Sequence, residues 1–364
     1  MNRKDGLKKG MVAAATATIL GMCSGAWAAD KVTFGIPNPA GIGDSTAHFA
    51  FAIELGYFKQ ENLELEMINF NGSAVLLPQV ATKAVDIGWG GPDILITGKQ
   101  PGRDQLPLRF FYNWLRGSVW EFVVLESSPV KTLAELKGRK IGVNFLSGGQ
   151  IPQTKATLKE AGLQAGNDVD LVPTGYGAPA FLALTTGKVD ALALFEGQHI
   201  TLENRGTKLR RLKVPDRYTR LFSDGFYAHE DTIRSRGTLL ARFGRAVTKG
   251  IVACEANTEG CVRALWKLYP SKKPVEGSEE KKMADAVRIL QARMTRILAF
   301  DAGAAQHFGE FPEKPWRDYL QIFKEVGQIA NENVPLDQLY TNQFVAEFNK
   351  FPVDEVRRQA RAAK

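Results

Sequence analysis

The stretch GAPAFLALTTGKVDALALFEG, residues 177–197, repeats the order of features in GSAVLLPQVATKAVDIGWGG, residues 72–91. Each copy opens with a glycine and an apolar helical segment, breaks before a Val-Asp pair, and continues as an apolar strand. Any α/β protein repeats strand–helix–strand units, but an equal spacing within the two copies favours two matching lobes. From the preceding strand to the aspartate the interval is 21 residues in each copy, Leu65 to Asp86 and Val169 to Asp190.

Outside the quoted stretches, the pattern extends each copy to five alternating elements. The first unit has apolar strands at 32–37 and 63–70 with a helical segment at 47–58 between them. The second unit has strands at 140–144 and 168–174 with a helical segment at 151–163 between them. Strands that alternate with helices predict a parallel-rich sheet in each lobe, and hence an α/β protein with two lobes.

Two strand-like segments connect the predicted lobes, residues 106–126 and residues 208–231. We therefore predict that lobe 2 is an insertion at 118–221 and that lobe 1 consists of 29–117 and 222–364. The last part of lobe 1 is strongly helical in pattern, and we expect its helices to pack mainly on lobe 1. Two crossing segments predict a hinge with a cleft between the lobes.

The first 28 residues have the pattern of a cleaved secretory signal peptide. Basic residues precede an apolar run of twelve residues, and small residues stand at Ala26 and Ala28. Export to the periplasm is therefore expected, with Ala29 as the mature N-terminus. Cys23 raises the alternative of a lipid anchor, but Met22 stands where such signals place a small residue. No second apolar run is long enough to span a membrane.

The remaining composition argues against several classes of protein. Removal of residues 1–28 lowers the formal charge from +8 to +5, and the basic residues are scattered, so no nucleic-acid partner is expected. The four histidines lie far apart, and no spacing is typical of a zinc site. No phosphate-binding loop or nucleophile elbow is present in the sequence. We therefore expect no metal, no cofactor and no catalytic residues.

Cys254 and Cys261 are the two cysteines of the mature chain. In one continuous helix their Cα atoms would be about 10 Å apart, which is too far for a disulfide. Asn257-Thr258 has the pattern of a helix stop followed by a new N-cap, and a bend there would bring the cysteines together. An oxidising compartment permits the bond, so the sequence leaves both states open.

Several motifs, in this order, resemble the periplasmic solute-binding proteins of ABC importers that serve nitrate, sulfonates, taurine and thiamine-pyrimidine precursors. They are ELGYFKQENLELE at 54–66, the two Val-Asp steps, Asn257-Thr258-Glu259, and LYTNQFVAEFNKFPVDEVRRQA at 339–360. The sequence departs from the family pattern at Thr258, where proline is usual, and at Pro352, where Asp or Asn is usual. The resemblance covers residues 30–364. It implies a type II periplasmic binding protein fold, a monomer, and delivery of a solute to a membrane permease.

In open α/β sheets, ligands bind beyond the carboxyl ends of the strands, so the loops at those ends are the candidates for a ligand site. Helix N-termini and glycines there suit an oxyanion, the acids suit an ammonium or a ring N–H, and the tryptophans and Arg116 suit a ring or a sulfonate. For each of these residues, the alternative to ligand contact is helix capping, core packing or exposure on the surface. The predicted ligand-binding residues are Asn38, Asp44, Ser45, Thr46, Ser73, Trp89, Gly91, Asp93, Trp114, Arg116, Ser147, Gly148, Gly149, Gln150, Tyr176 and Glu196.

The function that follows is capture of a small organic anion or zwitterion in the periplasm and its delivery to an ABC permease. Enzymes that act on a pyrimidine or a small-acid precursor share this fold and are the first alternative, although export argues against them. A secreted ligand sensor is the second alternative. Fold alone does not choose among these functions.

Overall fold

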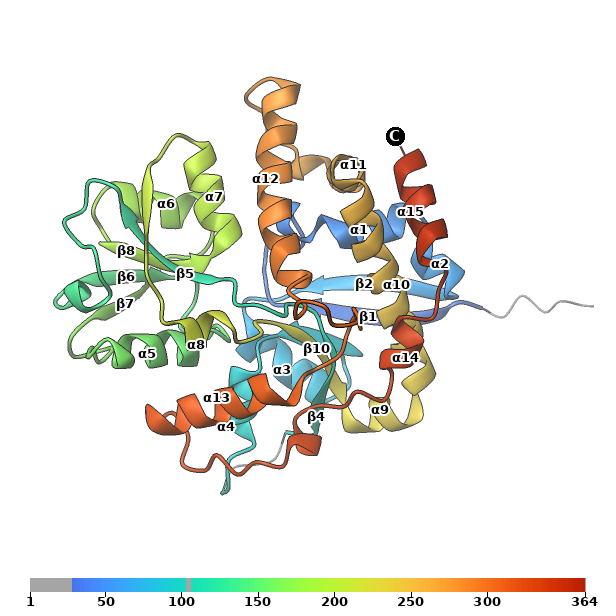
Figure 1. The fold of residues 1–364 in the computed structure, drawn as a ribbon, viewed down its shortest axis with the longest axis horizontal. Coiled ribbons are helices and arrows are strands. Elements are labelled where there is room, and N and C mark those ends of the chain that lie inside the picture. The colour runs from blue at the N-terminus through green and yellow to red at the C-terminus, as the bar shows by residue number, and fades with distance from the viewer. Residues whose placement is uncertain (1–27, 103–105, 364) are drawn as a thin grey trace, which may run out of the picture.

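The computed structural model describes residues 28–102 and 106–363, which form two lobes (Figure 1). Each lobe is built around one five-stranded sheet, with the strand orders β2-β1-β3-β10-β4 and β7-β6-β8-β5-β9. The predicted two-lobed α/β fold is therefore confirmed. The predicted signal peptide lies outside the described residues, except for Ala28.

Lobe 1 contains the first repeated unit in the predicted order. Its elements are β1 (Asp30–Ile36), α1 (Ala47–Glu54), β2 (Leu63–Asn69), α3 (Ser73–Ala81) and β3 (Ile87–Gly90). β1 pairs in parallel with both β2 and β3. The sheet is completed by β4 (Leu108–Asn113) and by β10 (Gly225–His229), which runs antiparallel to both of its neighbours.

Lobe 2 repeats this arrangement. Its elements are β6 (Lys140–Val143), α5 (Ile151–Glu160), β7 (Asp170–Pro173), α6 (Ala178–Thr185) and β8 (Ala191–Phe195). β6 pairs in parallel with β7 and β8, and the added strands are β5 (Trp120–Leu125) and β9 (Leu209–Leu212). The first strand of each unit therefore lies between the second and the third, and an antiparallel strand follows the third.

The repeated Val-Asp pair has the same structural role in both lobes. The Asp86 carboxylate accepts hydrogen bonds from the backbone N–H of Thr33 at 2.9 Å and from its hydroxyl at 3.0 Å. The Asp190 carboxylate accepts one from the backbone N–H of Lys140 at 2.9 Å. Each aspartate thus joins the start of the third strand to the first strand. Arg236 forms an ion pair with Asp86, and Arg139 forms one with Asp190.

The long C-terminal helices cover the sheet of lobe 1. α10 (Gly237–Ala256), α11 (Thr258–Leu268) and α15 (Val353–Ala362) pack on the side of α1 (Figure 1). Apolar residues of these helices join one core with β1, and the ring centroids of Phe34 and Phe243 are 5.2 Å apart within it. A second core lies on the other face of the sheet and includes the fully buried Trp316 of α13 (Glu313–Glu325).

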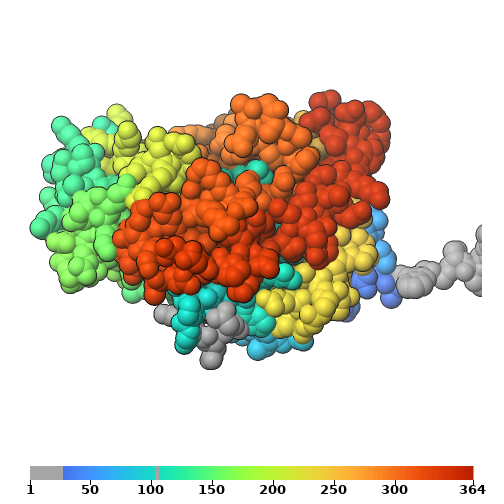
Figure 2. Space-filling model, turned by 60° about the horizontal axis from the view of Figure 1, so that its bottom comes forward, coloured from blue at the N-terminus to red at the C-terminus, as the bar shows by residue number. Residues whose placement is uncertain are grey.

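Two of the C-terminal helices also contact lobe 2. α12 (Glu279–Ile297) packs against α7 (Glu196–Asn204) and stands between the lobes in Figure 1. α13 contacts α5, and Lys159 donates a hydrogen bond to the carbonyl of Val326 at 2.7 Å. Figure 2 shows the C-terminal part of the chain lying across the face of the molecule and meeting lobe 2. The expectation of packing mainly on lobe 1 therefore holds for α10, α11 and α15, whereas α12 and α13 bridge the lobes.

Cys254 and Cys261 form a disulfide with a Cα–Cα distance of 5.2 Å. α10 ends at Ala256 and α11 begins at Thr258, so the two cysteines lie on different helices. The side chain of Asn257 between them accepts a hydrogen bond from the N–H of Gly260 at 2.8 Å, which makes it the predicted N-cap. The bend at this cap brings the two sulfur atoms together, and this decides the alternative that the sequence left open.

Short helices and turns complete the connections. They are η1 (Asp44–Thr46), α2 (Tyr57–Gln60), α4 (Asp93–Gly98), η2 (Ala134–Leu136), α8 (Asp216–Thr219), α9 (Glu230–Ser235), η3 (Pro270–Lys272), η4 (Leu336–Gln338) and α14 (Val345–Phe348). Across the residues that the structure describes, no helix combines the length and the apolar character needed to cross a membrane.

Candidate functional site

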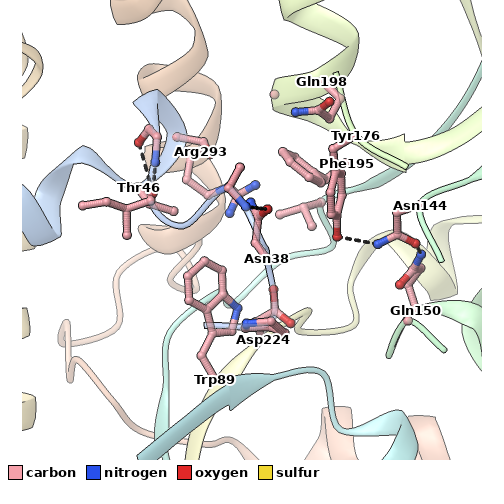
Figure 3. Close-up of a pocket in the computed structure, with 18 of the residues that line it drawn as sticks. Asn38, Thr46, Trp89, Asn144, Gln150, Tyr176, Phe195, Gln198, Asp224 and Arg293 are labelled. Carbon is pink, nitrogen blue, oxygen red and sulfur yellow. Dashed lines mark hydrogen bonds between the residues drawn. The ribbon is translucent and has the colours of Figure 1, made fainter. Parts of the chain in front are cut away.

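A cavity of about 260 Å³ lies between the two lobes (Figure 3). Its walls include the loops at the carboxyl ends of β1, β2, β3, β6, β7 and β8, where parallel sheets typically bind ligands. A cavity of this volume suits a small solute. Twelve predicted residues line it: Asn38, Asp44, Ser45, Thr46, Ser73, Trp89, Gly91, Asp93, Gly148, Gly149, Gln150 and Tyr176.

The two lobes touch each other at the edge of the cavity through glycines. A Cβ atom added at Gly72 would lie 3.4 Å from the hydroxyl of Ser147 on the other lobe. A Cβ atom added at Gly149 would lie 3.2 Å from the hydroxyl of Ser73 and 3.7 Å from the backbone nitrogen of Gly91. Gly72 also has a φ of +94°, which favours glycine at this position. The absence of a side chain at these positions lets the lobes close against each other.

Lobe 2 contributes a network of amide and phenol groups. The side-chain amide of Asn144 donates to the hydroxyl of Tyr176 at 2.5 Å, and its carbonyl accepts from Gln150. The side-chain carbonyl of Gln198 accepts from the backbone N–H of Gly177 at 2.6 Å. The ring of Tyr176 packs against Phe195 with centroids 5.7 Å apart. These contacts fix the orientation of the polar groups before a solute arrives.

Three carboxyl groups face the cavity, on Asp44, Asp93 and Asp224. Burial raises the pKa of Asp44 and that of Asp224 to about 6. Burial raises the pKa of Asp93 well above its usual value, and the charge of Asp224 adds to this effect. One side-chain oxygen of Asp44 and one of Asp93 are buried away from the cavity surface, and the indole of Trp266 lies beside Asp44. The carboxyl oxygens that reach the cavity can accept from a solute that carries N–H groups or positive charge.

Asp93 and Asp224 approach each other around Gly91. A Cβ atom added at Gly91 would lie 2.8 Å from a carboxylate oxygen of Asp93 and 3.8 Å from one of Asp224. The charge of Asp224 raises the pKa of Asp93, so the two groups repel each other when both are ionised. A hydrogen-bond donor placed near Gly91 would be within reach of both groups.

Glu196, a predicted ligand contact, instead forms a buried ion pair with Arg293. Nε of Arg293 lies 2.6 Å from Oε1 of Glu196, and Nη2 lies 3.1 Å from Oε2. Both residues are only 3% exposed. Arg293 lines the cavity and Glu196 does not, because the first turn of α7 directs its carboxylate towards α12.

Three further predicted residues lie outside the cavity. Trp114 is buried in the core of lobe 1, where it lies edge-on to Trp89 at 4.6 Å and donates to His48 at 3.1 Å. Arg116 points away from the cavity, stacks on Phe300, and donates to a backbone carbonyl at 2.9 Å. Both residues lie just after β4, on the irregular segment that connects the lobes, and their side chains do not line the cavity. Ser147 is exposed at the edge where the lobes touch.

Other residues of the cavity were not predicted as contacts, and they include Asn144, Gln198, Asp224 and Arg293. Asn144 ends the predicted strand at 140–144, so its position at a strand end was a usable signal. Asp224 directly precedes β10, in the segment that crosses back to lobe 1. Arg293 had no local signal, because it stands in the interior of a helix that is far from any strand end in the sequence.

The described residues contain no group of three or more His, Cys, Asp or Glu side chains that could hold a metal ion.

The family model described as "NMT1/THI5 like" matches residues 45–260, more than half of the 364-residue chain. A Haemophilus influenzae protein named for thiamine biosynthesis is 31% identical over 141 residues, which is 39% of this chain and 43% of that protein. The chain thus spans less than half the length of that relative.

Solved structures share the fold over most of their length. The alkanesulfonate-binding protein SsuA from Xanthomonas axonopodis, bound to MOPS, has a TM-score of 0.64 at 15% identity, covering 85% of this chain and 98% of its own. The periplasmic aliphatic sulphonate-binding protein SsuA from Escherichia coli has a TM-score of 0.63 at 16% identity, covering 86% and 92%. These likenesses show the type II periplasmic binding protein fold.

An enzyme shares this fold as well. The desulfurization enzyme DszB in complex with biphenyl-2-sulfinic acid has a TM-score of 0.56 at 17% identity, covering 88% of this chain and 99% of its own. The fold is therefore compatible with both binding and catalysis, and the side chains of the cavity must distinguish them.

Proposed function

This chain belongs to the NMT1/THI5-like family, and we propose that it is the solute-binding component of an ABC import system. The observation that carries the proposal is a cavity of about 260 Å³ enclosed by loops from both lobes. A solute held there contacts both lobes at once, so its binding energy favours the closed arrangement. The predicted signal peptide and the SsuA structures support a periplasmic site of action and delivery to a membrane permease.

The solute class follows from the charges around the cavity. Among the described residues that line the cavity, the one guanidinium is that of Arg293, and Glu196 already neutralises it. Asp44 and Asp224, with pKa values raised by burial to about 6, are mostly ionised at pH 7. Lys272 lines the cavity edge and donates to the carbonyl of Ala40. Carboxylates therefore outnumber free cations, and a simple anion is disfavoured by Coulomb repulsion.

The preferred solute carries an ammonium or ring N–H group together with an acceptor group. Its donor faces Asp93 and Asp224, and its acceptor faces Arg293. Aromatic side chains complete the walls, with Trp89 in lobe 1 and Tyr176 and Phe195 in lobe 2. They suit a flat ring or a short aliphatic linker, and their faces attract positive charge. A zwitterion or a nitrogen heterocycle fits this description.

A matched pair of solutes tests the proposal. Taurine and isethionate share the same sulfonate and linker, but isethionate has a hydroxyl group in place of the ammonium. We expect taurine, or an aminopyrimidine included beside it, to raise the melting temperature, and isethionate to leave it unchanged. Binding at a hundredfold excess over the dissociation constant stabilises the fold by about 2.7 kcal/mol. Equal stabilisation by taurine and isethionate would contradict the assigned solute class.

Transport rather than catalysis is the function that the cavity supports. Neither a cysteine nor a histidine is among the described residues that line the cavity. Quantitative recovery of the unchanged solute after release from the protein is therefore expected. A chemically altered solute would favour an enzyme of this fold.

A further inference from the structure

We propose that Arg293 is the specificity-determining residue of the cavity and that Glu196 is the positioning residue that makes lobe closure depend on it. The inference deepens the proposed function and rests on it for the presence of a solute. Arg293 and Glu196 form a buried ion pair between the two lobes, and one edge of the Arg293 guanidinium remains free towards the cavity.

The pair joins two elements that belong to different lobes. Arg293 stands on α12, whose apolar residues Leu290 and Met294 are part of the main core of lobe 1. Glu196 is the first residue of α7, directly after the last parallel strand of lobe 2. Closure therefore brings the two charges together, and opening separates them and returns both to water.

Glu196 fixes the orientation of the guanidinium. Its carboxylate binds Nε and Nη2 of Arg293 in a fork, which leaves Nη1 as the remaining edge. Nη1 has no hydrogen-bond partner within the described residues. Figure 3 shows the Arg293 side chain extending from α12 towards the middle of the cavity. The free edge is thus placed where an acceptor group of the solute can meet it.

The surroundings keep the charge of Arg293 desolvated. The guanidinium lies 5.8 Å from the ring centre of Trp114 and 5.4 Å from that of Phe195. His48 is fully buried nearby, and burial and the charge of Arg293 lower its pKa to about 3, so it stays neutral. The Nη1 edge opens into the cavity, so an acceptor on the solute would gain a charge-assisted hydrogen bond there. The ion pair with Glu196 holds the lobes together without a solute, and the free edge selects the solute.

A second ion pair between the same two helices supplies a matched control. Arg288 of α12 binds Glu203 of α7 at 2.6 Å, but the Arg288 side chain is 52% exposed. Exposed pairs contribute little to stability, whereas removal of one partner from a buried pair leaves an uncompensated charge. Comparison of the two pairs therefore distinguishes an exposed ion pair from a buried ion pair that holds the lobes together.

The test measures lobe closure without any solute, by single-molecule energy transfer between dyes on Leu182→Cys and Lys267→Cys. Both positions are exposed, one on each lobe. Wild type is expected to populate the closed distance. Glu196→Leu and Arg293→Met alone should each lower the closed-to-open ratio about 100-fold, because each leaves one buried charge unpaired. The double substitution should recover most of the closed population, and Arg288→Met should change the ratio less than about fivefold.

Three results would overturn the inference. They are a wild type that is wholly open, an Arg288→Met variant that opens as far as Arg293→Met, and a double variant that opens by the sum of the two single effects. A second readout then tests specificity: the closed double variant should bind taurine about 10- to 100-fold more weakly than wild type, as expected for loss of a charged hydrogen bond. Unchanged taurine affinity would refute the role of Nη1. If no solute binds wild type, the proposed function fails. The solute-free measurement still tests whether the Arg293–Glu196 pair holds the lobes closed.

Discussion

Substitution of Asp224 by asparagine should stabilise the solute-free protein, and the gain should depend on pH. Burial raises the pKa of Asp224 from its usual 3.8 to about 6, against the attraction of Arg293. A carboxyl group with a raised folded-state pKa binds its proton more tightly in the folded protein, so ionisation reduces stability as pH rises through that range. The difference between pKa values of 3.8 and about 6 corresponds to a reduction of about 3 kcal/mol in the free energy of unfolding at pH 8, since one pKa unit is 1.36 kcal/mol.

The same relation gives a penalty of about 1 kcal/mol at pH 4.5, where the carboxyl group is mostly protonated when folded. Asp224→Asn should therefore raise the free energy of unfolding by about 2 kcal/mol more at pH 8 than at pH 4.5. Urea unfolding at both pH values measures this difference. Asp216→Asn is the matched control, because its side chain is 72% exposed and lies outside the cavity.

A pH-independent effect of Asp224→Asn, or destabilisation that is larger at pH 8, would refute this reasoning. The substitution should also weaken the binding of an ammonium-bearing solute about 10-fold or more, by loss of a charged acceptor. Higher stability together with weaker binding would show that the fold retains a costly buried charge for recognition.

Three further predictions concern other parts of the molecule. Arg116→Ala should leave the affinity for taurine within about twofold, because Arg116 binds a backbone carbonyl outside the cavity; a loss of tenfold or more would place it in the site. The unreduced, denatured mature chain should show no free thiol in a labelling assay, and two labelled thiols would exclude the bond. Reduction should lower the stability of the folded protein by about 2–3 kcal/mol, the loop-closure value for two cysteines seven residues apart. Intact mass of periplasmic material should correspond to a chain that starts at Ala29, and a lipidated Cys23 would contradict that cleavage.

Much of the site could be predicted because strand ends are visible in the sequence. Ser73, Trp89 and Gln150 follow or end apolar runs, and parallel sheets bring such ends to a single edge. Four predicted residues do not line the cavity: Ser147, Glu196, and Trp114 and Arg116 on the segment between the lobes. Trp114 and Arg116 lie close in the sequence to residues that line the cavity. The direction of their side chains, however, depends on packing against distant residues such as His48 and Phe300.

The sequence by itself determined the repeated unit, because the Val-Asp pair, the glycine before each helix and the equal spacing are local features with local structural consequences. Asp86 and Asp190 each join neighbouring strands of their own lobe. Only the tertiary structure decided the electrostatics of the cavity. Glu196 and Arg293 are 97 residues apart, and no pattern relates them. Their pairing requires that α12 pack on lobe 1 while facing lobe 2, and such contacts arise from the docking of whole elements rather than from the periodicity of any one of them.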